Sequence, residues 1–543
     1  AVVDDSGRFP KRYQAANTPI VPTKIFREPS KHLTQYEVAI KTGENIWRRV
    51  IVDGDELADS KKIIRLAKDG GALIESPSHL AKFFARFIAE NSTRIPEIKC
   101  YQQPGWHGDK FIYPTGGDDY IVRRAGFDYE HEFATCGDRE KSKQAIVDAC
   151  DKGGAFVRVF LGFSLASSLV RPFNIPNIQA QIHGKSGGGK TALEKLCASI
   201  HGNPRKLIRT FAATLKNRQA VAAAYNDLPS FLDELETVNG GKKGEESLPQ
   251  MIYDFSLGTA NQANKRDGSV RETFEFFGSR LMTGERPILK SHDQRGAYKR
   301  LVQMHVDNLF DDFFSADLHF TAENNYGHFG KDWANFQTEH LKEMHNEYIS
   351  RTTAALSKNY LCEPTLVKAI AAASLATQYF FVCIGVKDSF DAETFAADAN
   401  FILSTLPTQE DIDDSTRAIK DLQSFFAGHD KYFVRDVKDN SAQGFTTYTQ
   451  NAWECYGKKF SNSEVAFLPT ALKKILENEL GYQSMDALIA EWASKGLLRC
   501  GNGRGYRFST RINGKVVSAI IFKAGIISSN DDDTAEDEYY ATE

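Results

Sequence analysis

The sequence has few cysteines, and none of them are closely paired. Its 543 residues include eight cysteines, and no two lie within three positions of each other. This spacing disfavours a disulfide-stapled secreted scaffold and a four-ligand zinc knuckle. Scattered thiols fit a reducing compartment, so we expect a cytoplasmic protein.

The sequence also lacks a long apolar run free of charge. Its two most apolar windows, 155–173 and 366–386, contain Arg158 and Lys368. A bilayer span of about 20 residues does not normally carry such side chains. We therefore expect two buried helices and no membrane partner. The sequence contains no His-Glu-x-x-His pattern and no recognisable nucleophile triad, which gives no support to a protease or esterase.

A strong excess of one charge is absent from the body of the chain. The sequence has 67 basic and 71 acidic residues, giving a net charge of −4. Seven of the acids lie after residue 530, so the remainder has 67 basic against 64 acidic residues and is mildly basic. We expect 526–543 to be an acidic, disordered tail, either a solubilising end or a mimic of nucleic acid.

Shifts in composition and periodicity divide the chain before this tail. We expect an α/β protein with an extended arm (1–33), an N-terminal α+β domain (34–140), an α/β core (141–306), a helical region (307–429) and a small mixed domain (430–525). In the N-terminal domain, alternation predicts a hairpin of 36–41 with 47–52. Helical patterns follow near 56–68 and 78–89.

A glycine-rich loop is the most informative motif. Residues 184–191 match G-x-x-x-x-G-K-[ST], between a strand pattern at 178–183 and a helical pattern at 192–201. Glycines let several backbone N–H groups point at one phosphate, the lysine attracts the β- and γ-phosphates, and the hydroxyl can hold Mg²⁺. We therefore predict that ATP binds to Gly184, Lys185, Ser186, Gly187, Gly188, Gly189, Lys190 and Thr191.

An acidic pair follows a second short apolar run. Asp233 and Glu234 end this run, 43 residues after Lys190. We expect Asp233 to hold Mg²⁺ together with Thr191, and Glu234 to orient and deprotonate the attacking water. A glutamate beside the aspartate favours ATP hydrolysis over phosphoryl transfer to a small acceptor.

A third strand pattern at 278–283 ends in polar groups that could sense the γ-phosphate. Thr283 is the first candidate and Glu285 the alternative. Farther along, Arg295 and Arg300 are candidate arginine fingers that would reach the ATP of a neighbouring subunit. Either arginine could instead be an ordinary surface residue.

A hairpin pattern lies just before the third strand. It runs from 261 to 276 around an Asp-Gly turn, and it carries Lys265, Arg266 and Arg271. These cations could grip a phosphate backbone, so we predict a DNA contact there. The alternative is a solvated hairpin tip.

At this point the chain resembles the MCM-like, self-loading helicase family of bacterial mobile elements and cassette chromosomes. These are AAA+ ATPases with a hairpin before sensor 1. The resemblance covers about residues 35–525. The matching elements are Gly105-Trp106-His107, Pro114, the loop 184–191, Thr214, Asn217, Ala222, Asn226-Asp227, Asp233-Glu234, Lys265-Arg266, Gly284-Glu285, Arg300 and Tyr326-Gly327.

The resemblance implies an AAA+ P-loop core at 141–306, a homo-hexameric ring and a C-terminal winged helix. The residue patterns agree with the last of these: helices near 469–480 and 485–495 precede strands near 497–500 and 506–510, joined by a turn at 501–505. Arg504 and Arg507 make this wing basic, which suits DNA, although a winged helix can also bind protein.

The sequence therefore predicts an ATP-dependent DNA helicase or translocase that replicates a mobile element or phage-like replicon. Its partners would be ATP, Mg²⁺, single- or double-stranded DNA and further copies of itself. One alternative is a DNA-remodelling or packaging motor without strand separation. The other is a nucleotide-gated assembly or DNA-binding module.

Overall fold

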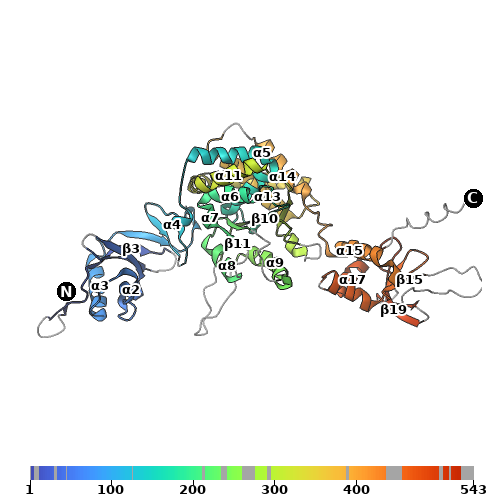
Figure 1. Ribbon diagram of the computed structural model, residues 1–543, viewed down its shortest axis with the longest axis horizontal. Helices are drawn as coiled ribbons and strands as arrows, with labels where there is room; N and C mark the ends of the chain where they lie inside the picture. The colour runs from blue at the N-terminus through green and yellow to red at the C-terminus, as the bar shows by residue number, and fades with distance from the viewer. Residues whose placement is uncertain are drawn as a thin grey trace, which may run out of the picture.

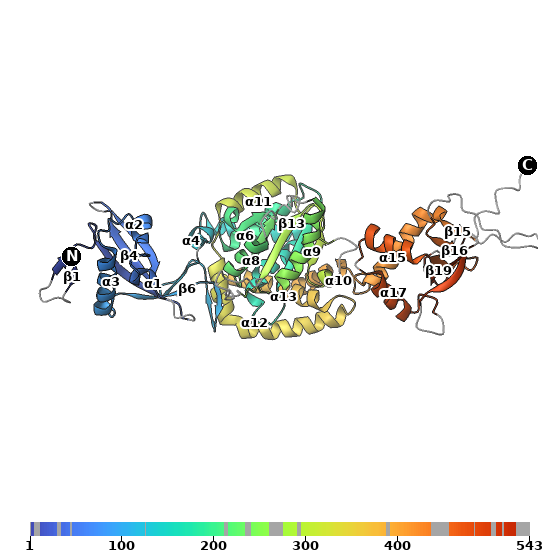
Figure 2. The ribbon, with the colours of Figure 1, turned by 90° about the horizontal axis from the view of Figure 1, so that it is seen from below.

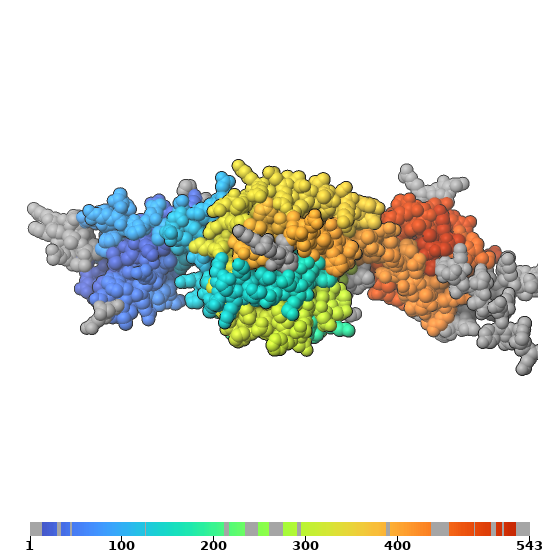
Figure 3. Space-filling view, turned by 90° about the horizontal axis from the view of Figure 1, so that it is seen from above, coloured from blue at the N-terminus to red at the C-terminus, as the bar shows by residue number. Residues whose placement is uncertain are grey.

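A computed structural model describes residues 2–4, 11–29, 34–43, 46–124, 126–210, 215–233, 241–259, 275–289, 295–386, 391–435, 455–482, 484–500, 506–512 and 515–527. The chain forms three parts in a row (Figure 1), each with its own hydrophobic core. From blue to red they follow the chain order, and the space-filling view in Figure 3 shows that the central part is the broadest.

The N-terminal part is a five-stranded sheet with three helices. The strand order is β5-β4-β3-β6-β9, comprising β5 (Trp47–Asp53), β4 (Thr34–Lys41), β3 (Ile20–Arg27), β6 (Glu97–Tyr101) and β9 (Tyr120–Val122). The predicted hairpin is confirmed, since β4 and β5 pair antiparallel with Tyr36 opposite Val52. The helices are α1 (Gly54–Ala58), α2 (Arg65–Gly70) and α3 (Pro77–Asn91). The helix expected at 56–68 is split because Asp59 is extended, with φ −99° and ψ 116°.

Residues 20–27, expected to lie in an extended arm, belong instead to the N-terminal sheet, which corrects that expectation for this segment. Strand β3 lies at the centre of the N-terminal sheet, antiparallel to β4 and parallel to β6. Its Ile20, Ile25 and Phe26 side chains are buried, so hydrophobic burial holds this segment in the sheet. Ahead of it, β1 (Val2–Asp4) and β2 (Lys11–Tyr13) pair with each other.

The central part is built on a parallel sheet, as Figure 2 shows from below. The order is β11-β12-β13-β10-β14, and each neighbouring pair is parallel; the central strand, β13, is labelled in Figure 2. The strands are β10 (Ile178–His183), β11 (Ile208–Thr210), β12 (Ser230–Asp233), β13 (Ser279–Gly284) and β14 (Val302–His305). The α/β class is confirmed, and the strands expected at 178–183 and 278–283 are present to within one residue.

Helices cover both faces of this sheet. They are α5 (Arg139–Leu165), the 3₁₀ turn η1 (Ala166–Leu169), α6 (Lys190–His201), α7 (Pro204–Leu207), α8 (Leu215–Ala224), α9 (Gly241–Ser256) and α10 (Arg295–Tyr298). Helix α5 is kinked at Gly154, whose φ of 59° leaves the helical region. Before α5, strands β7 (Gly105–His107) and β8 (Lys110–Ile112) and helix α4 (Tyr129–Glu132) pack into the central core. The expected boundary at residue 140 stays a prediction.

The helical region follows β14. It contains α11 (Asp312–Asn324), α12 (Gly330–Lys358), α13 (Pro364–Cys383) and α14 (Ala392–Thr405). Helix α13 is the one described helix that is long and apolar enough to cross a membrane, yet 78% of its apolar window is buried within the protein. It packs between α5, α12 and α14, so it is a core helix, as expected for 366–386.

The C-terminal part combines helices with a mixed sheet. The helical segments are α15 (Asp414–His429), the 3₁₀ turn η3 (Asp430–Tyr432), α16 (Pro469–Lys473), the π-helical turn η4 (Lys474–Glu479) and α17 (Met485–Ser494). The strands, in sheet order, are β15 (Phe433–Arg435), β16 (Gly457–Lys459), β17 (Val465–Phe467), β19 (Lys515–Phe522) and β18 (Phe508–Ile512). The helices expected near 469–480 and 485–495 are confirmed.

The strand pairing of the wing differs from the expectation. The segments 497–500 and 506–510 do not pair with each other among the described residues. Instead β18 pairs with β19, and Leu498 bridges Phe522 farther along β19. The apolar end of β19, Ala519 to Phe522, is buried and draws both segments onto one strand.

Candidate nucleotide site

A cavity of about 650 Å³ opens at the carboxyl ends of β10, β12 and β13. Carboxyl ends of parallel strands meet at one edge of the sheet, which is where α/β proteins bind ligands. The cavity brings together the glycine-rich loop, two strand ends and one face of α11. It is lined by Ser186, Gly187, Gly188, Gly189, Lys190, Thr191, Ala192, Asp233, Thr283, Gly284, Glu285, Ser315, Ala316 and His319.

The backbone of the loop requires glycine at several positions. Gly187 and Gly189 have φ of 84° and 82°, in the left-handed region that other residues rarely adopt. A Cβ atom at Gly188 would lie 2.4 Å from the carbonyl oxygen of Asp307. The Gly188 carbonyl in turn accepts a hydrogen bond from the backbone N–H of Leu309 at 2.9 Å. The loop is thus a tightly packed turn against the segment after β14.

Lys190 begins α6 at the floor of the cavity. It is 8% exposed, and its Nζ donates hydrogen bonds to the carbonyl oxygens of Gly184 at 2.9 Å and Lys185 at 2.5 Å. These carbonyls hold the ammonium group inside the loop. The expected phosphate-binding lysine therefore lies at the start of a helix, where the helix dipole also favours an anion.

Asp233 and Thr283 meet across neighbouring strands. The Thr283 hydroxyl is hydrogen-bonded to Oδ1 of Asp233, and both residues line the cavity. Glu285 lines it too, so both sensor candidates remain at the site. Sequence reasoning brought these residues to one edge because it identified their strands.

A buried acid beside this pair was missed by sequence reasoning. Glu194, on α6, is 0% exposed, and its Oε2 lies 3.0 Å from the Thr283 Oγ1. Burial raises the pKa of Glu194 well above its usual range, and the nearby charge of Asp233 adds to this. The sequence signal for Glu194 was an acidic residue one helical turn after Lys190, beside the apolar residues Leu193 and Cys197 of the same helix.

The two candidate arginine fingers lie away from the cavity of their own chain. Arg295 is paired with Asp413, with Nη1 3.3 Å from Oδ1. Arg300 lies 4.9 Å above the ring of Tyr253, and it donates to the Gly296 carbonyl at 2.6 Å. Neither arginine is among the residues that line the cavity.

Several predicted residues lie outside the described residues, namely Glu234, Lys265, Arg266, Arg271, Arg504, Thr214 and the tail from residue 528. Of the predicted hairpin at 261–276, only residues 275 and 276 are described, and Glu275 forms an antiparallel bridge with Thr259, which precedes the hairpin. Arg507 is exposed just ahead of β18.

The motif at 105–107 and the pair at 226–227 form a buried junction. The Trp106 N–H donates to Oδ2 of Asp227 at 2.9 Å, and Arg171 Nη2 lies 3.3 Å from the same oxygen. A Cβ at Gly105 would lie 2.3 Å from this oxygen. Burial raises the pKa of Asp227 to about 6. These motif residues tie β7 to the turn before β12 and do not enter the nucleotide cavity.

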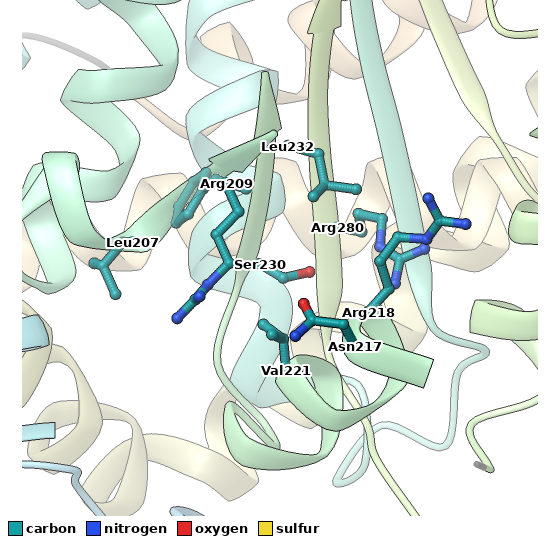
Figure 4. Close-up of a pocket in the computed structure, with 9 residues that line it drawn as sticks. Leu207, Arg209, Asn217, Arg218, Val221, Ser230, Leu232 and Arg280 are labelled. Atoms are coloured by element: carbon teal, nitrogen blue, oxygen red, sulfur yellow. The ribbon is translucent and has the colours of Figure 1, made fainter. Parts of the chain in front are cut away.

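A much smaller cavity lies at the amino ends of β12 and β13 (Figure 4). It measures about 20 Å³ and is lined in part by Arg209, Arg218 and Arg280. Arg280 is 4% exposed and lies 4.0 Å above the ring of Phe255, and burial lowers its pKa to about 9. This space admits about one water molecule, so it is not a second nucleotide site.

Two family models match the sequence. One, described as a domain of unknown function, DUF927, matches residues 4–274. The other, described as the Cch helix turn helix domain, matches residues 413–525, which include α15 to β19. No curated protein matches the chain.

Solved structures give a likeness over nearly the whole chain. A structure described as "SCCmec type IV Cch - active helicase" has a TM-score of 0.68 and 16% identity, covering 96% of both chains. Two apo structures of the NrS-1 C-terminal region have TM-scores of 0.32 and 0.33 at 12% and 13% identity, covering 92% of this chain and 95% of theirs. Scores that low support no comparison of detail. At 16% identity, the first likeness shows that this chain shares the fold of the SCCmec type IV Cch helicase.

Proposed function

We propose that this protein is an ATP-driven DNA helicase or translocase that acts as an oligomeric ring in replication of a mobile element or phage-like replicon. One observation carries the proposal. The glycine-rich loop, Asp233 and Thr283 line a single open cavity at the carboxyl edge of a parallel sheet. Its volume, about 650 Å³, suits a ligand the size of a nucleotide.

In this proposal, residues 141–306 are an AAA+ P-loop core, 307–429 a helical region and 430–525 a winged-helix-like domain, with the last helix of the helical region, α15, packed into the core of the C-terminal part. The parallel order β11-β12-β13-β10-β14 supports the first assignment, because it places one strand, β13, between the P-loop strand and the strand that ends in Asp233. The match to a helix-turn-helix family supports the last. The scattered thiols still favour a cytoplasmic location.

The residues at the cavity fit ATP and Mg²⁺. The backbone N–H groups of 186–191 would donate hydrogen bonds to the phosphates, and the positively charged Lys190 ammonium would attract them. The oxygens of Thr191 and Asp233 line the same cavity, and Mg²⁺ prefers oxygen ligands. Bound there, Mg²⁺ would neutralise charge on the phosphates. Glu234 would orient and deprotonate the attacking water, and Thr283 or Glu285 would sense the γ-phosphate.

The cavity is short of positive charge, which supports a ring. Lys190 is the only lysine or arginine among its described lining residues. Phosphoryl transfer gains from a second cation at the transferring group. Arg295 or Arg300 of a neighbouring copy would supply it, in the homo-hexamer that the resemblance implies. Phe313 and Phe320, 86% and 67% exposed on the helix that borders the cavity, offer an apolar surface for such a neighbour.

DNA would meet two parts of the chain. The predicted hairpin cations Lys265, Arg266 and Arg271 would contact the backbone of single- or double-stranded DNA. Arg504 and Arg507 would contact it from the wing. The solved structure with the same fold is itself described as an active helicase.

The test is ATP hydrolysis by the purified chain, with and without single-stranded DNA, beside Glu234→Gln. Stimulation by DNA that is lost in the variant supports a DNA motor. A forked duplex then separates the alternatives: unwinding supports a helicase, whereas displacement of a bound protein from a duplex that stays paired supports a remodelling motor. Tight ATP binding without hydrolysis would overturn both in favour of an assembly module.

A further inference from the structure

A carboxyl group that solvent does not reach lies directly behind the nucleotide cavity. Oε2 of Glu194 is 3.0 Å from the Thr283 hydroxyl, and the same hydroxyl is hydrogen-bonded to Oδ1 of Asp233. Glu194 is 0% exposed, whereas Asp233 lines the cavity. Thr283 therefore lies between Glu194, which is fully buried, and Asp233, which faces the cavity.

The number of hydrogens decides how these three groups are bonded. A threonine hydroxyl has one hydrogen, and an ionised carboxylate has none. Asp233 lines the cavity, where a negative charge costs less than it does at the fully buried Glu194, so the hydroxyl donates to Asp233. The Thr283 oxygen can then only accept from its other neighbour. Glu194 can fill that place only as a neutral acid, which donates its own hydrogen.

The surroundings of Glu194 agree with the neutral form. Its second oxygen, Oε1, has no hydrogen-bond partner among the described residues. An ionised carboxylate buried in that state would be very costly, and a neutral acid much less so. Burial and the charge of Asp233 raise the pKa of Glu194, and they outweigh the opposite effects of the Thr283 side chain, the Leu232 backbone and Lys195.

We propose that Glu194 is a positioning residue that donates a hydrogen bond to Thr283 and thereby holds the Thr283 hydroxyl on Asp233. The Thr283 hydroxyl then occupies one lone pair of the Asp233 carboxylate. This bond fixes the carboxylate in one orientation toward the cavity. Its catalytic consequence rests on the proposed ATP hydrolysis, in which that carboxylate holds Mg²⁺. Groups that orient a metal ligand in this way affect activity without touching substrate.

A purely structural role makes a different prediction. Leu193 and Cys197, the neighbours of Glu194 on α6, are fully buried and apolar. If Glu194 only filled this core, leucine would replace it at little or no cost, because a buried polar group often tolerates an apolar residue of similar volume. Glutamine, in contrast, keeps the shape and a hydrogen-bond donor.

The decisive experiment compares steady-state ATP hydrolysis by the full chain and by Glu194→Gln, Glu194→Leu, Thr283→Val and the Leu/Val double variant. We expect Glu194→Gln to keep kcat within about threefold, because its amide donates. We expect Glu194→Leu to lower kcat about 10- to 100-fold with little change in KM, and the double variant to be no worse than Thr283→Val alone, because Glu194 acts through Thr283. Wild-type kcat in Glu194→Leu, or equal losses in the Gln and Leu variants, would overturn the proposal.

A second measurement does not depend on hydrolysis. Thermal unfolding should give a drop in Tm for the double variant that is smaller than the sum of the drops in Glu194→Leu and Thr283→Val, because these two single variants break the same bond. Additive drops would overturn the proposal. If the wild-type chain itself does not hydrolyse ATP, the proposed function fails, and the unfolding cycle still decides whether Glu194 holds Thr283.

Discussion

The two ends of the central sheet use the same parallel strands in opposite ways. At the carboxyl end, glycine-rich backbone and the polar side chains of Asp233 and Thr283 surround an open cavity of about 650 Å³. At the amino end, Arg209, Arg218 and Arg280 surround a space of about 20 Å³ (Figure 4). More arginines lie at the closed end, yet only the open end can admit a nucleotide.

The difference follows from what each end must pack against. The strands are followed by loops at their carboxyl ends. At Gly188 any side chain would collide with the Asp307 carbonyl, so the loop backbone itself lines the cavity. At the amino end, the Arg280 guanidinium is covered by the Phe255 ring and withdrawn from solvent. We infer that the open end carries the chemistry and that the charges at the closed end are structural.

The first prediction tests whether the open end is complete within one chain. If Arg300 is a trans finger, Arg300→Ala should lower kcat about 10³-fold, because it removes the cation that stabilises the transferring phosphoryl group. Mixing it with Lys190→Ala protomers should restore part of the activity, since some interfaces then pair an intact loop with an intact arginine. The measurement is hydrolysis as a function of mixing ratio. Arg295→Ala run in parallel identifies which arginine acts, and no recovery for either arginine would contradict a finger in trans.

The second prediction concerns the lysine inside the loop. Lys190→Ala should lower hydrolysis about 10²- to 10³-fold, because it removes a charge from the phosphate site. The Tm should stay near wild type, since the bonds lost to the Gly184 and Lys185 carbonyls lie within one loop. Lys206→Ala, at an exposed position on α7, is the matched control and should hydrolyse normally. Equal activity of the two variants would show that the cavity is not the hydrolytic site.

The third prediction moves to the closed end, where Asp227 lies in the turn before β12. Burial raises its pKa to about 6 from an ordinary 3.8, so the folded protein holds this proton more tightly than the unfolded chain. Stability should therefore fall as the pH rises from about 4 to about 6, by up to about 3 kcal/mol, and change little from this group above that range.

Asp227→Asn should remove that pH dependence, as measured by denaturant unfolding at several pH values. The matched control is Asp109→Asn, an exposed aspartate between β7 and β8, which should keep the wild-type slope. Identical slopes in the Asp227 variant and the wild type would show that the three donors around this carboxylate, from Trp106, Arg171 and Asn226, outweigh its burial.

Much of the open end was predictable because the glycine-rich loop, Asp233 and Thr283 lie at or just after the ends of short apolar strands. The strand at 178–183, the loop after it and Thr283 were found from local pattern alone, and parallel pairing then brought them to one edge. Glu194 was not found, because a helix pattern does not show which side chain faces Asp233 and Thr283 until the sheet is placed.

The ends of the chain were less predictable for a related reason. Residues 20–27 look like an extended arm, since no local signal says that β3 will lie between β4 and β6. The predicted strand pairing of the wing was wrong for the same reason. Leu498 and β18 were expected to pair with each other, but both pair with β19, whose buried end lies more than twenty residues beyond Leu498. Nonlocal pairing, rather than propensity, decided both cases.

The last prediction has the smallest effect and bears most directly on the comparison of the two ends. Arg280 is buried, and its Nε has no hydrogen-bond partner among the described residues. Arg280→Leu should raise the free energy of unfolding by about 1 kcal/mol, because removing an imperfectly paired buried charge often outweighs the loss of stacking on Phe255. Arg280→Lys should lower the free energy of unfolding, because an ammonium keeps the charge but cannot stack as a plane.

Both variants should leave kcat without DNA within about threefold, since neither touches the cavity. Denaturant unfolding and hydrolysis of the two variants check this together. A large loss of kcat in Arg280→Leu with an unchanged Tm would mean that the closed end also serves the chemistry, and the division between the two ends would not hold.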